Sequence, residues 1–236
     1  MDLSGQVALV TGASSGIGEA TAKALTDEGV RVGLAARREE RLAEVADHIR
    51  NEGGEALVLP TDIRDEEQIV AMVEETESVF GGLDILVNNA GVARRGPFAS
   101  TDRTDVRQQV EVNMLGMLNV THEALPGMIE SGGGDIVVVS SVNAREPAEG
   151  ASTYSGTKSG INGFCDALRK EVAAEGVRVT VVLPGAVDTE AVSLGDVDDV
   201  LDPADVADTI TFAVSRPDNV LMAEFTVAAS PPLPYR

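Results

Sequence analysis

The chain of 236 residues contains no tryptophan, one cysteine and two histidines. Cys165 has no partner within the chain, which fits a reducing compartment and excludes a cysteine-rich metal site. His48 and His122 alone give little support to histidine-based catalysis or to a metal centre. No apolar run is long enough to span a membrane, and no basic leader precedes the first apolar stretch. We therefore expect neither a membrane span nor an export signal, and we expect a cytoplasmic protein.

Positive charge is also scarce, with 18 Lys and Arg against 39 Asp and Glu and a formal net charge of −21. The lysines are Lys23, Lys158 and Lys170, and the other basic residues are arginines. Such a surface repels nucleic acids and anionic membranes, so neither is expected as a partner. Abundant carboxylates, few lysines and 3% aromatic residues predict adaptation to high salt. An acidic protein from an ordinary cytoplasm is the alternative.

Apolar runs and helical patterns alternate along the whole chain. Strands are predicted at residues 6–10, 30–35, 56–59, 83–87, 136–139, 177–183 and 225–228. Helices are expected between them, including long ones at residues 103–130 and 152–174 and a last one at 204–214. Repeated βα units predict an α/β fold of Rossmann type, a doubly wound parallel sheet of about seven strands with helices on both faces. We expect a single domain over residues 1–236, with a cofactor half at about 1–100 and a catalytic half at about 101–236.

A glycine-rich turn follows the first predicted strand. Gly12, Gly16 and Gly18 lack the Cβ atoms that would block a tight turn and the close approach of a pyrophosphate to a helix N-terminus. The spacing Gly-x-x-x-Gly-x-Gly differs from the commoner dinucleotide fingerprint. Its place between the first strand and helix of a βαβ unit nevertheless predicts a dinucleotide site.

The second strand ends in Arg37 and Arg38, with no carboxylate at its tip. An acidic residue there usually binds the ribose of NAD, whereas an arginine accommodates the 2′-phosphate of NADP. The planar guanidinium of Arg37 suits a phosphate group. NADP is therefore favoured over NAD, although an arginine pair on so acidic a surface can also be a simple counter-charge.

Tyr154 and Lys158 lie four residues apart on a predicted helix, so both side chains can point from the same face. Ser141 lies thirteen residues before Tyr154, directly after an apolar strand. A free tyrosine has a pKa of about 10, and lowering it to about 7 takes about 4 kcal/mol of electrostatic help. A nearby lysine and a cationic cofactor are expected to supply it. Taken alone, this spacing is more typical of an ordinary pair on a helix surface.

Together, residues 11–18, 88–91, Asn113, Ser141, Tyr154 with Lys158, and the Pro184-Gly185 pair resemble the short-chain dehydrogenase/reductase family in its ordinary single-domain form. The resemblance runs over about residues 6–189 in the order and spacing of the family. It implies that Tyr154 is the catalytic acid and base, that Lys158 lowers its pKa and holds the nicotinamide ribose, and that Ser141 binds the substrate oxygen. Asn113 would anchor a water that leads from Lys158 to solvent.

The resemblance also implies a set of cofactor-binding residues: Gly12, Ser14, Ser15, Gly16, Ile17, Gly18, Arg37, Arg38, Asp62, Ile63, Asn89, Ala90, Gly91, Tyr154, Lys158, Pro184, Gly185, Val187 and Thr189. Asp62 and Ile63 would border the adenine, although an aspartate after a strand is also a common helix cap. Val187 and Thr189 would contact the nicotinamide end. No metal is expected.

The predicted activity is hydride transfer between a nicotinamide cofactor and a small carbonyl compound or secondary alcohol, such as a 3-hydroxy acid. The segment 190–202, a lid in the family, is short and acidic, which favours a compact substrate. Arg94 or Arg95 could receive a carboxylate, and the alternative is that both are solvated loop residues or interface contacts. The alternatives are an NAD-dependent alcohol or polyol dehydrogenase of the same fold and a non-catalytic NADP-binding regulator. An extended sugar-nucleotide epimerase needs more residues than follow Thr189. The family also implies a homo-oligomer, a dimer or tetramer, paired through the two long helices.

Overall fold

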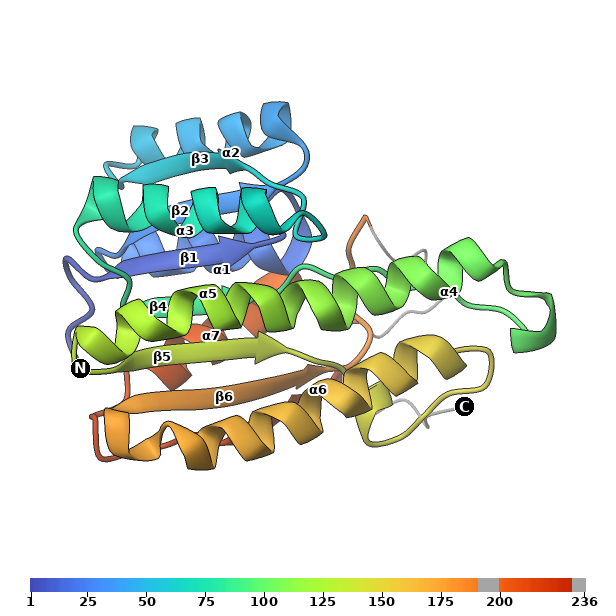
Figure 1. Cartoon of the computed structure of the whole chain (residues 1–236). Helices are drawn as coiled ribbons and strands as arrows, with labels where there is room; N and C mark the ends of the chain where they lie inside the picture. Colours follow the sequence, from blue (N-terminus) through green and yellow to red (C-terminus); the bar gives the residue numbers. More distant parts are fainter. Residues whose placement is uncertain (191–199, 231–236) are drawn as a thin grey trace.

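The computed structural model describes residues 1–190 and 200–230 and builds them around a parallel sheet (Figure 1). Seven strands in this part of the chain pair in the order β3-β2-β1-β4-β5-β6-β7. They are β1 (Val7–Thr11), β2 (Arg31–Ala36), β3 (Ala56–Pro60), β4 (Ile85–Asn88), β5 (Gly134–Val139), β6 (Val177–Pro184) and β7 (Glu224–Val227). The α/β fold of Rossmann type predicted from the alternating pattern is confirmed, including the parallel direction of the last strand.

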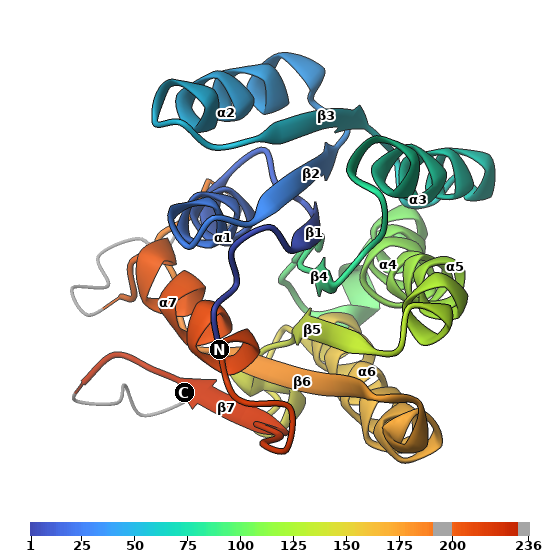
Figure 2. The ribbon, with the colours of Figure 1, turned by 90° about the vertical axis from the view of Figure 1, so that its left-hand side faces the viewer.

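Helices cover both faces of this sheet (Figure 2). They are α1 (Gly16–Asp27), α2 (Glu39–Asn51), α3 (Glu66–Phe80), α4 (Arg103–Val110), α5 (Met117–Glu130), α6 (Ser152–Glu171) and α7 (Pro203–Val214). The apolar residues of α1, α2 and α7 pack in one core cluster, and those of α3, α5 and α6 pack in the other. Among the helices of the described residues, none has the length and apolar character needed to cross a membrane.

The sequence pattern explains this layering. All five residues of β1 are buried, as expected for a central strand with a helix layer on each side. In α2 the buried residues are Leu42, Val45, Ala46 and Ile49, which recur at the helical period and form one apolar face.

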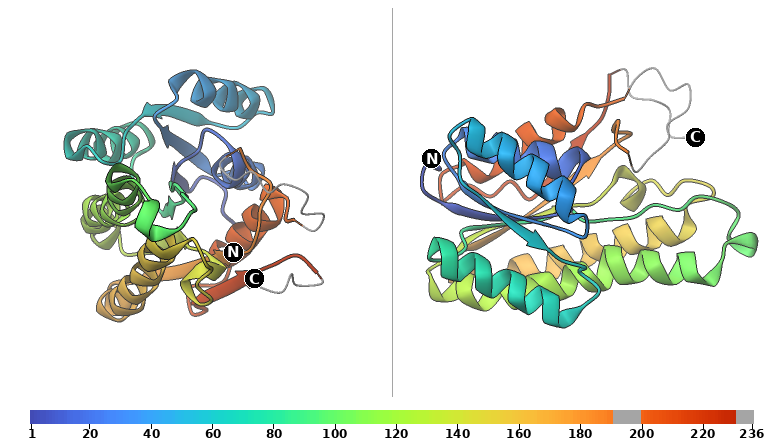
Figure 3. Two further views of the ribbon diagram at one scale, coloured as in Figure 1. Left: turned by 90° about the vertical axis from the view of Figure 1, so that its right-hand side faces the viewer. Right: turned by 90° about the horizontal axis from the view of Figure 1, so that it is seen from above.

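The order of the strands creates a crevice at one end of the sheet. Chain connections run outward from β1 in one direction through β2 and β3, and in the other through β4 to β7. Ligands of such sheets bind beyond the carboxyl ends of the strands, at this point of reversal. That end of the sheet faces the viewer in the left panel of Figure 3.

The long helix predicted at residues 103–130 has an interruption. A π-helical stretch, Glu111–Gly116, joins α4 to α5, and its flanking residues keep helical backbone angles. The three pieces therefore form one long rod, seen from above in the right panel of Figure 3. Single π turns inside α-helices occur frequently at functional sites, and this one contains Asn113.

Candidate active site

The glycine turn is shaped for close approach between backbone segments. Gly12 and Gly16 have positive φ angles of 70° and 55°, which glycine adopts without strain. A Cβ on Gly12 would lie 2.8 Å from Asn89 Nδ2, and a Cβ on Gly18 would overlap the carbonyl oxygen of Gly12. Ser15 is the N-cap of α1 but makes no side-chain cap hydrogen bond. The first amides of α1 therefore remain available to an anion, as a dinucleotide site requires.

Asn89 and Thr11 connect this turn to the end of β4. Asn89 Nδ2 donates to the carbonyl oxygens of Thr11 at 3.0 Å and Gly12 at 3.3 Å. The hydroxyl of Thr11 accepts from the backbone amides of Asn89 and Ala90. The predicted residues Asn89 and Ala90 thus lie directly against the glycine turn, whereas Gly91 lies beside Asn113 and Lys158.

The side chain of Arg38, rather than that of Arg37, is hydrogen-bonded to the glycine turn. Its guanidinium donates to the hydroxyls of Ser14 at 3.2 Å and Ser15 at 2.7 Å, and to Glu190 Oε2 at 2.9 Å. Arg37 is exposed, and within the described ranges no hydrogen bond or ion pair involves its side chain. A phosphate at this position would therefore meet two guanidinium groups. That of Arg38 is already hydrogen-bonded to the glycine turn, and that of Arg37 has no partner within the described residues.

Asp62 and Ile63 follow β3 at the adenine side of the predicted site. Asp62 pairs with Arg64 at 2.5 Å, and hydrogen bonding to that guanidinium lowers the pKa of the Asp62 carboxyl. The N-cap of α3 is Asp65, whose side chain accepts from the amides of Glu67 and Gln68. Asp62 is therefore not the cap of this helix. Ile63 is buried and packs against Gly116 of the π-helical stretch.

Ser141 and Ser140 follow β5 and point in different directions. Ser140 Oγ donates to Asn162 Oδ1 at 2.6 Å, inside the packing between β5 and α6. Ser141 Oγ accepts from the amide of Asn143 at 3.2 Å and interacts with the phenol of Tyr154. Of the two neighbouring serines, only Ser141 lies against Tyr154.

Tyr154 lies in the first turn of α6 and is partly buried. Burial raises the pKa of its phenol above the ordinary value, and hydrogen bonding to Ser141 and the charge of Arg95 oppose this shift. The lowered pKa expected for Tyr154 is therefore not found in the protein alone. Lys158 Nζ lies 5.8 Å from the centre of the tyrosine ring, beside the aromatic face.

Lys158 is 5% exposed and donates from Nζ to the carbonyl oxygen of Val139 at 2.8 Å. Burial lowers the pKa of its ammonium to about 8. A Cβ placed on Gly91 would lie 3.5 Å from Asn113 Oδ1 and 3.8 Å from Lys158 Nζ. The ends of β4 and β5, the π-helical stretch and α6 thus converge on one small volume.

Asn113 uses its side chain to fix the segment after β4. Its Oδ1 accepts from the amide of Val92 at 2.7 Å, and its Nδ2 donates to the carbonyl oxygen of Val92 at 2.8 Å. A third, longer hydrogen bond joins Nδ2 to the hydroxyl of Thr157, which lies beside Lys158 in the chain. The side chain of Asn113 therefore positions backbone, and the predicted water between Asn113 and Lys158 remains a prediction.

The segment after β6 closes the crevice from the other side. Gly185 donates to Val227, and Val187 pairs with Leu201 in an isolated parallel bridge. A Cβ on Gly16 would lie 2.9 Å from Thr189 Cγ2, so Thr189 contacts the glycine turn. Thr189 therefore lies beside the glycine turn, and the place of Pro184, Gly185, Val187 and Thr189 at the nicotinamide end remains a prediction.

Comparison with known proteins agrees with this geometry. The sequence profile of the short chain dehydrogenase family matches residues 6–196. An uncharacterized oxidoreductase of Staphylococcus aureus is 35% identical over 95% of this chain and 97% of its own. The chain belongs to this family.

Two solved structures of similar shape contain a nicotinamide cofactor. A metagenomic short-chain oxidoreductase in complex with NADP is 33% identical, with a TM-score of 0.86 over 96% of this chain and 98% of its own. A 3-ketoacyl-(acyl-carrier-protein) reductase from Brucella melitensis complexed with NADH is 30% identical, with a TM-score of 0.90 over 95% and 97% of the two chains. This short-chain dehydrogenase is thus an oxidoreductase with a nicotinamide nucleotide fold, and its relatives carry either cofactor.

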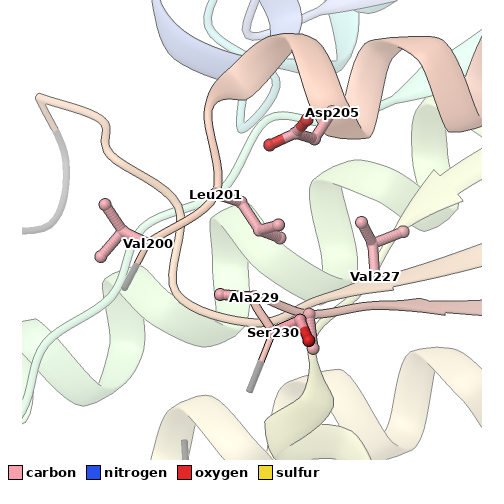
Figure 4. A pocket seen from close by; sticks show the side chains of 7 residues that line it. Val200, Leu201, Asp205, Val227, Ala229 and Ser230 are labelled. Atoms are coloured by element: carbon pink, nitrogen blue, oxygen red, sulfur yellow. The ribbon is translucent and has the colours of Figure 1, made fainter. Parts of the chain in front are cut away.

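A separate pocket of this short-chain dehydrogenase lies beside the carboxyl end of β7 (Figure 4). It is lined by Val200, Leu201, Asp205, Val227, Ala228, Ala229 and Ser230. None of the four predicted catalytic residues lines it. The predicted lid at residues 190–202 approaches this pocket at its far end, but residues 191–199 of that lid lie outside the described residues.

Three contacts of the short-chain dehydrogenase site were missed by sequence reasoning. They are the Thr11 hydroxyl under the glycine turn, the link from Thr157 to Asn113, and the ion pair between Arg38 and Glu190. Thr11 stands at the end of the first strand, and its place directly before the turn is a usable signal. The other two join residues far apart in the sequence, and no local pattern marks them.

Proposed function

We propose that the protein is an NADP(H)-dependent oxidoreductase that interconverts a small carbonyl compound and a secondary alcohol. The observation that carries the proposal is the convergence of Ser141, Tyr154 and Lys158 at the end of the sheet that also holds the glycine turn. The positive φ angles of that turn and the uncapped start of α1 suit a dinucleotide pyrophosphate. When bound, the nicotinamide cofactor supplies or accepts the hydride.

The residues of this chain would handle the proton and the substrate oxygen. During reduction the carbonyl oxygen gains negative charge, and Ser141 Oγ and the Tyr154 phenol would both donate hydrogen bonds to it. Tyr154 would then transfer its proton to that oxygen and take it back in the oxidation direction. Because burial keeps the Tyr154 phenol protonated, the protein alone is poised for the reducing direction.

Lys158 would supply positive charge close to Tyr154 and bind the nicotinamide ribose. Its amine is held by Val139, and Asn113 fixes Val92 on the opposite side of the same volume. With a pKa of about 8, the ammonium of Lys158 is mostly charged at neutral pH. The charge of bound oxidised nicotinamide would add to this field and help lower the pKa of Tyr154 during alcohol oxidation.

The 2′-phosphate of NADP would bind at Arg37 and Arg38. Support comes from the absence of a carboxylate at the tip of β2 and from the anchoring of Arg38 on Ser14 and Ser15. An NAD-dependent alcohol or polyol dehydrogenase is the second candidate, because a relative of the same shape carries NADH. The presence of Asn113, Ser141, Tyr154 and Lys158 argues against a non-catalytic regulator.

Arg95 favours a carboxylate on the substrate. The amide of Gly96 donates to Gly150 at 2.8 Å, which holds the Arg95 loop against the start of α6, and the charge of Arg95 reaches Tyr154. The neighbouring Arg94 is instead paired with Asp105 at 3.6 Å. Within the described ranges Arg95 makes no ion pair, so a small hydroxy acid would find a cation beside the reacting oxygen.

A homo-oligomer is part of the proposal. Val110 and Leu115 on the long rod of α4 and α5 are exposed at 42% and 50%, which is unfavourable for large apolar side chains in water. A dimer or tetramer would cover them. Sedimentation at low and high salt tests this, and a monomer under both conditions would contradict it.

A substrate and cofactor screen tests the activity. The purified protein would be assayed with small secondary alcohols, hydroxy acids and the corresponding carbonyl compounds, each with NADP(H) and NAD(H), at several salt concentrations. The expected result is NADP-linked turnover with a compact hydroxy acid. Arg95→Gln should raise KM for that acid much more than KM for uncharged alcohols, whereas the matched Arg94→Gln should change neither KM. Tight NADP binding without turnover of any compound would favour the regulator.

A further inference from the structure

The carboxylate of Glu190 lies against two arginines, Arg38 after β2 and Arg41 in α2. Its Oε2 accepts from Arg38 Nη1 at 2.9 Å, and its Oε1 lies 3.6 Å from Arg41 Nη2. Hydrogen bonding to Arg38 holds the pKa of the Glu190 carboxyl below its ordinary range, so the group is an anion at neutral pH. At Arg38, Glu190 thus supplies the kind of negative charge that a phosphate would bring to the same guanidinium.

The remaining contacts of Arg38 fix which of its nitrogens Glu190 uses. Nε and Nη2 are directed at Ser14 and Ser15 in the glycine turn. Nη1, by contrast, makes its contact with Glu190, across the mouth of the crevice. A phosphate that pairs with Arg38 from outside the turn therefore meets Glu190 at the same nitrogen.

We propose that Glu190 is a specificity-determining residue that competes with the 2′-phosphate of NADP for Arg38. The inference rests on the proposed binding of NADP at Arg37 and Arg38. Binding of the phosphate would replace one anion on Arg38 by another and release Glu190, which follows Thr189 beside the glycine turn. Glu190 would thus weaken the preference for NADP without acting on NAD, which brings no charge to Arg38.

The strength of this competition is limited by exposure. The side chains of Arg38 and Glu190 are 48% and 56% exposed. Exposed ion pairs contribute little to binding, and their contribution weakens further as salt is added. Removing the charge of Glu190 should therefore tighten NADP binding by about fivefold at most, and the gain should shrink as salt is added.

The test compares Glu190→Gln with the wild-type protein by calorimetric titration of NADP, NAD, adenosine 2′,5′-bisphosphate and adenosine 5′-monophosphate. Glu44→Gln is the matched control, because Glu44 pairs with Arg41 at 2.6 Å and does not contact Arg38. Glu190→Gln should tighten NADP and the bisphosphate and leave NAD and the monophosphate unchanged, and Glu44→Gln should change none of them. Circular dichroism confirms that each variant is folded in the buffer used.

Several results would overturn the inference. An equal change for NADP and NAD would mean that Glu190 acts on the loop rather than on the phosphate. Weaker binding of NADP to Glu190→Gln would mean that Glu190 helps to hold the cofactor. No change in NADP binding would mean that Glu190 does not compete for Arg38. Failure of the proposed function would give a different result, because the wild-type protein would then bind NAD as tightly as NADP. The ratio of the affinities for the bisphosphate and the monophosphate would still report on competition at Arg38.

Discussion

The two ends of the candidate site differ in burial. At the catalytic end, Asn113, Ser141 and Lys158 are 1%, 6% and 5% exposed, and most of their contacts are hydrogen bonds to backbone. At the nucleotide edge, Arg38 and Glu190 are about half exposed and interact chiefly through charge. The buried end should show large effects of single substitutions that depend little on salt, whereas the edge should show small effects that salt screens.

The pKa shifts at the two ends also have different physical causes. Burial is the first cause of the shifts of Tyr154 and Lys158, and it favours the neutral form of both. At the edge, hydrogen bonding to arginine is the first cause of the shifts of Asp62 and Glu190, and it favours the charged form. Proton transfer at neutral pH needs the first environment, and recognition of a phosphate needs the second.

The largest effect is expected for Tyr154→Phe at the buried end. Loss of the phenolic proton donor should lower kcat/KM by about a thousandfold or more, since general acid and base catalysis contributes about 10²–10⁴. Steady-state kinetics would measure the loss, and calorimetric titration should show NADP binding within about twofold of wild type. Activity within tenfold of wild type would contradict the role of Tyr154 and remove the contrast between the two ends.

Ser141→Ala should have the next largest effect. Removing one hydrogen-bond donor from a developing oxyanion costs about 10²–10³ in kcat. The matched control is Ser140→Ala, because Ser140 Oγ is bonded to Asn162 and not to the site. Ser140→Ala should leave kcat unchanged and lower the free energy of unfolding by about 1–3 kcal/mol, measured by urea denaturation. The opposite outcome would exchange the roles of the two serines.

Lys158 should produce a pH dependence with a predictable sign. Its pKa is lowered to about 8, so kcat/KM for carbonyl reduction should fall by about tenfold per pH unit above that value as the cation is lost. The Tyr154 phenol stays protonated there because its pKa is raised. A pH profile of kcat/KM would measure the fall, and a profile that stays flat to pH 10 would contradict a role for the Lys158 charge.

The pH dependence of the free energy of unfolding provides a second, independent test of the lowered pKa of Lys158. The ammonium is less easily protonated in the folded protein than in the unfolded chain, so between about pH 8 and 10.5 the unfolded chain binds more protons. Stability should therefore rise with pH across that window, by about 3 kcal/mol at most. Lys158→Met should lack this rise, which denaturant titration at several pH values would detect.

The sequence predicts the fold well because its signals are local and repeated. Apolar runs such as residues 177–183 and the helical period of Leu42, Val45, Ala46 and Ile49 each indicate one element, and alternation then requires a parallel sheet. The π-helical stretch around Asn113 leaves no such mark, because its residues keep ordinary helical composition. Local reasoning also offered Asp62 as a helix cap, whereas Asp65 caps α3.

The site was predictable where its residues follow strands, and less so where it depends on burial. The resemblance to the family pointed to Ser141, and the structure shows that the neighbouring Ser140 is instead hydrogen-bonded to Asn162. The direction of the Tyr154 shift could not be predicted, because the helical spacing of Tyr154 and Lys158 says nothing of the desolvation around them. Likewise, the pairing of Arg38 with Glu190 joins residues that only the closed sheet brings together.

The smallest of these effects is expected at the exposed edge, where substitutions of two neighbouring arginines should differ. Arg37→Ala should lower kcat/KM with NADP by about tenfold and leave NAD unaffected, because a charge-assisted hydrogen bond is worth about 1.5–3 kcal/mol and exposure places this one at the low end. Arg38→Ala should also weaken NAD, since it loosens the contacts with Ser14 and Ser15 that support the pyrophosphate turn. Arg41→Ala removes the same charge one turn further along and should change neither cofactor by more than about twofold. Equal kcat/KM with both cofactors, together with no effect of Arg37→Ala, would refute the NADP assignment. A loss of kcat/KM much larger than tenfold would mean that the bound cofactor buries this edge. The contrast with the catalytic end would then hold only for the free protein.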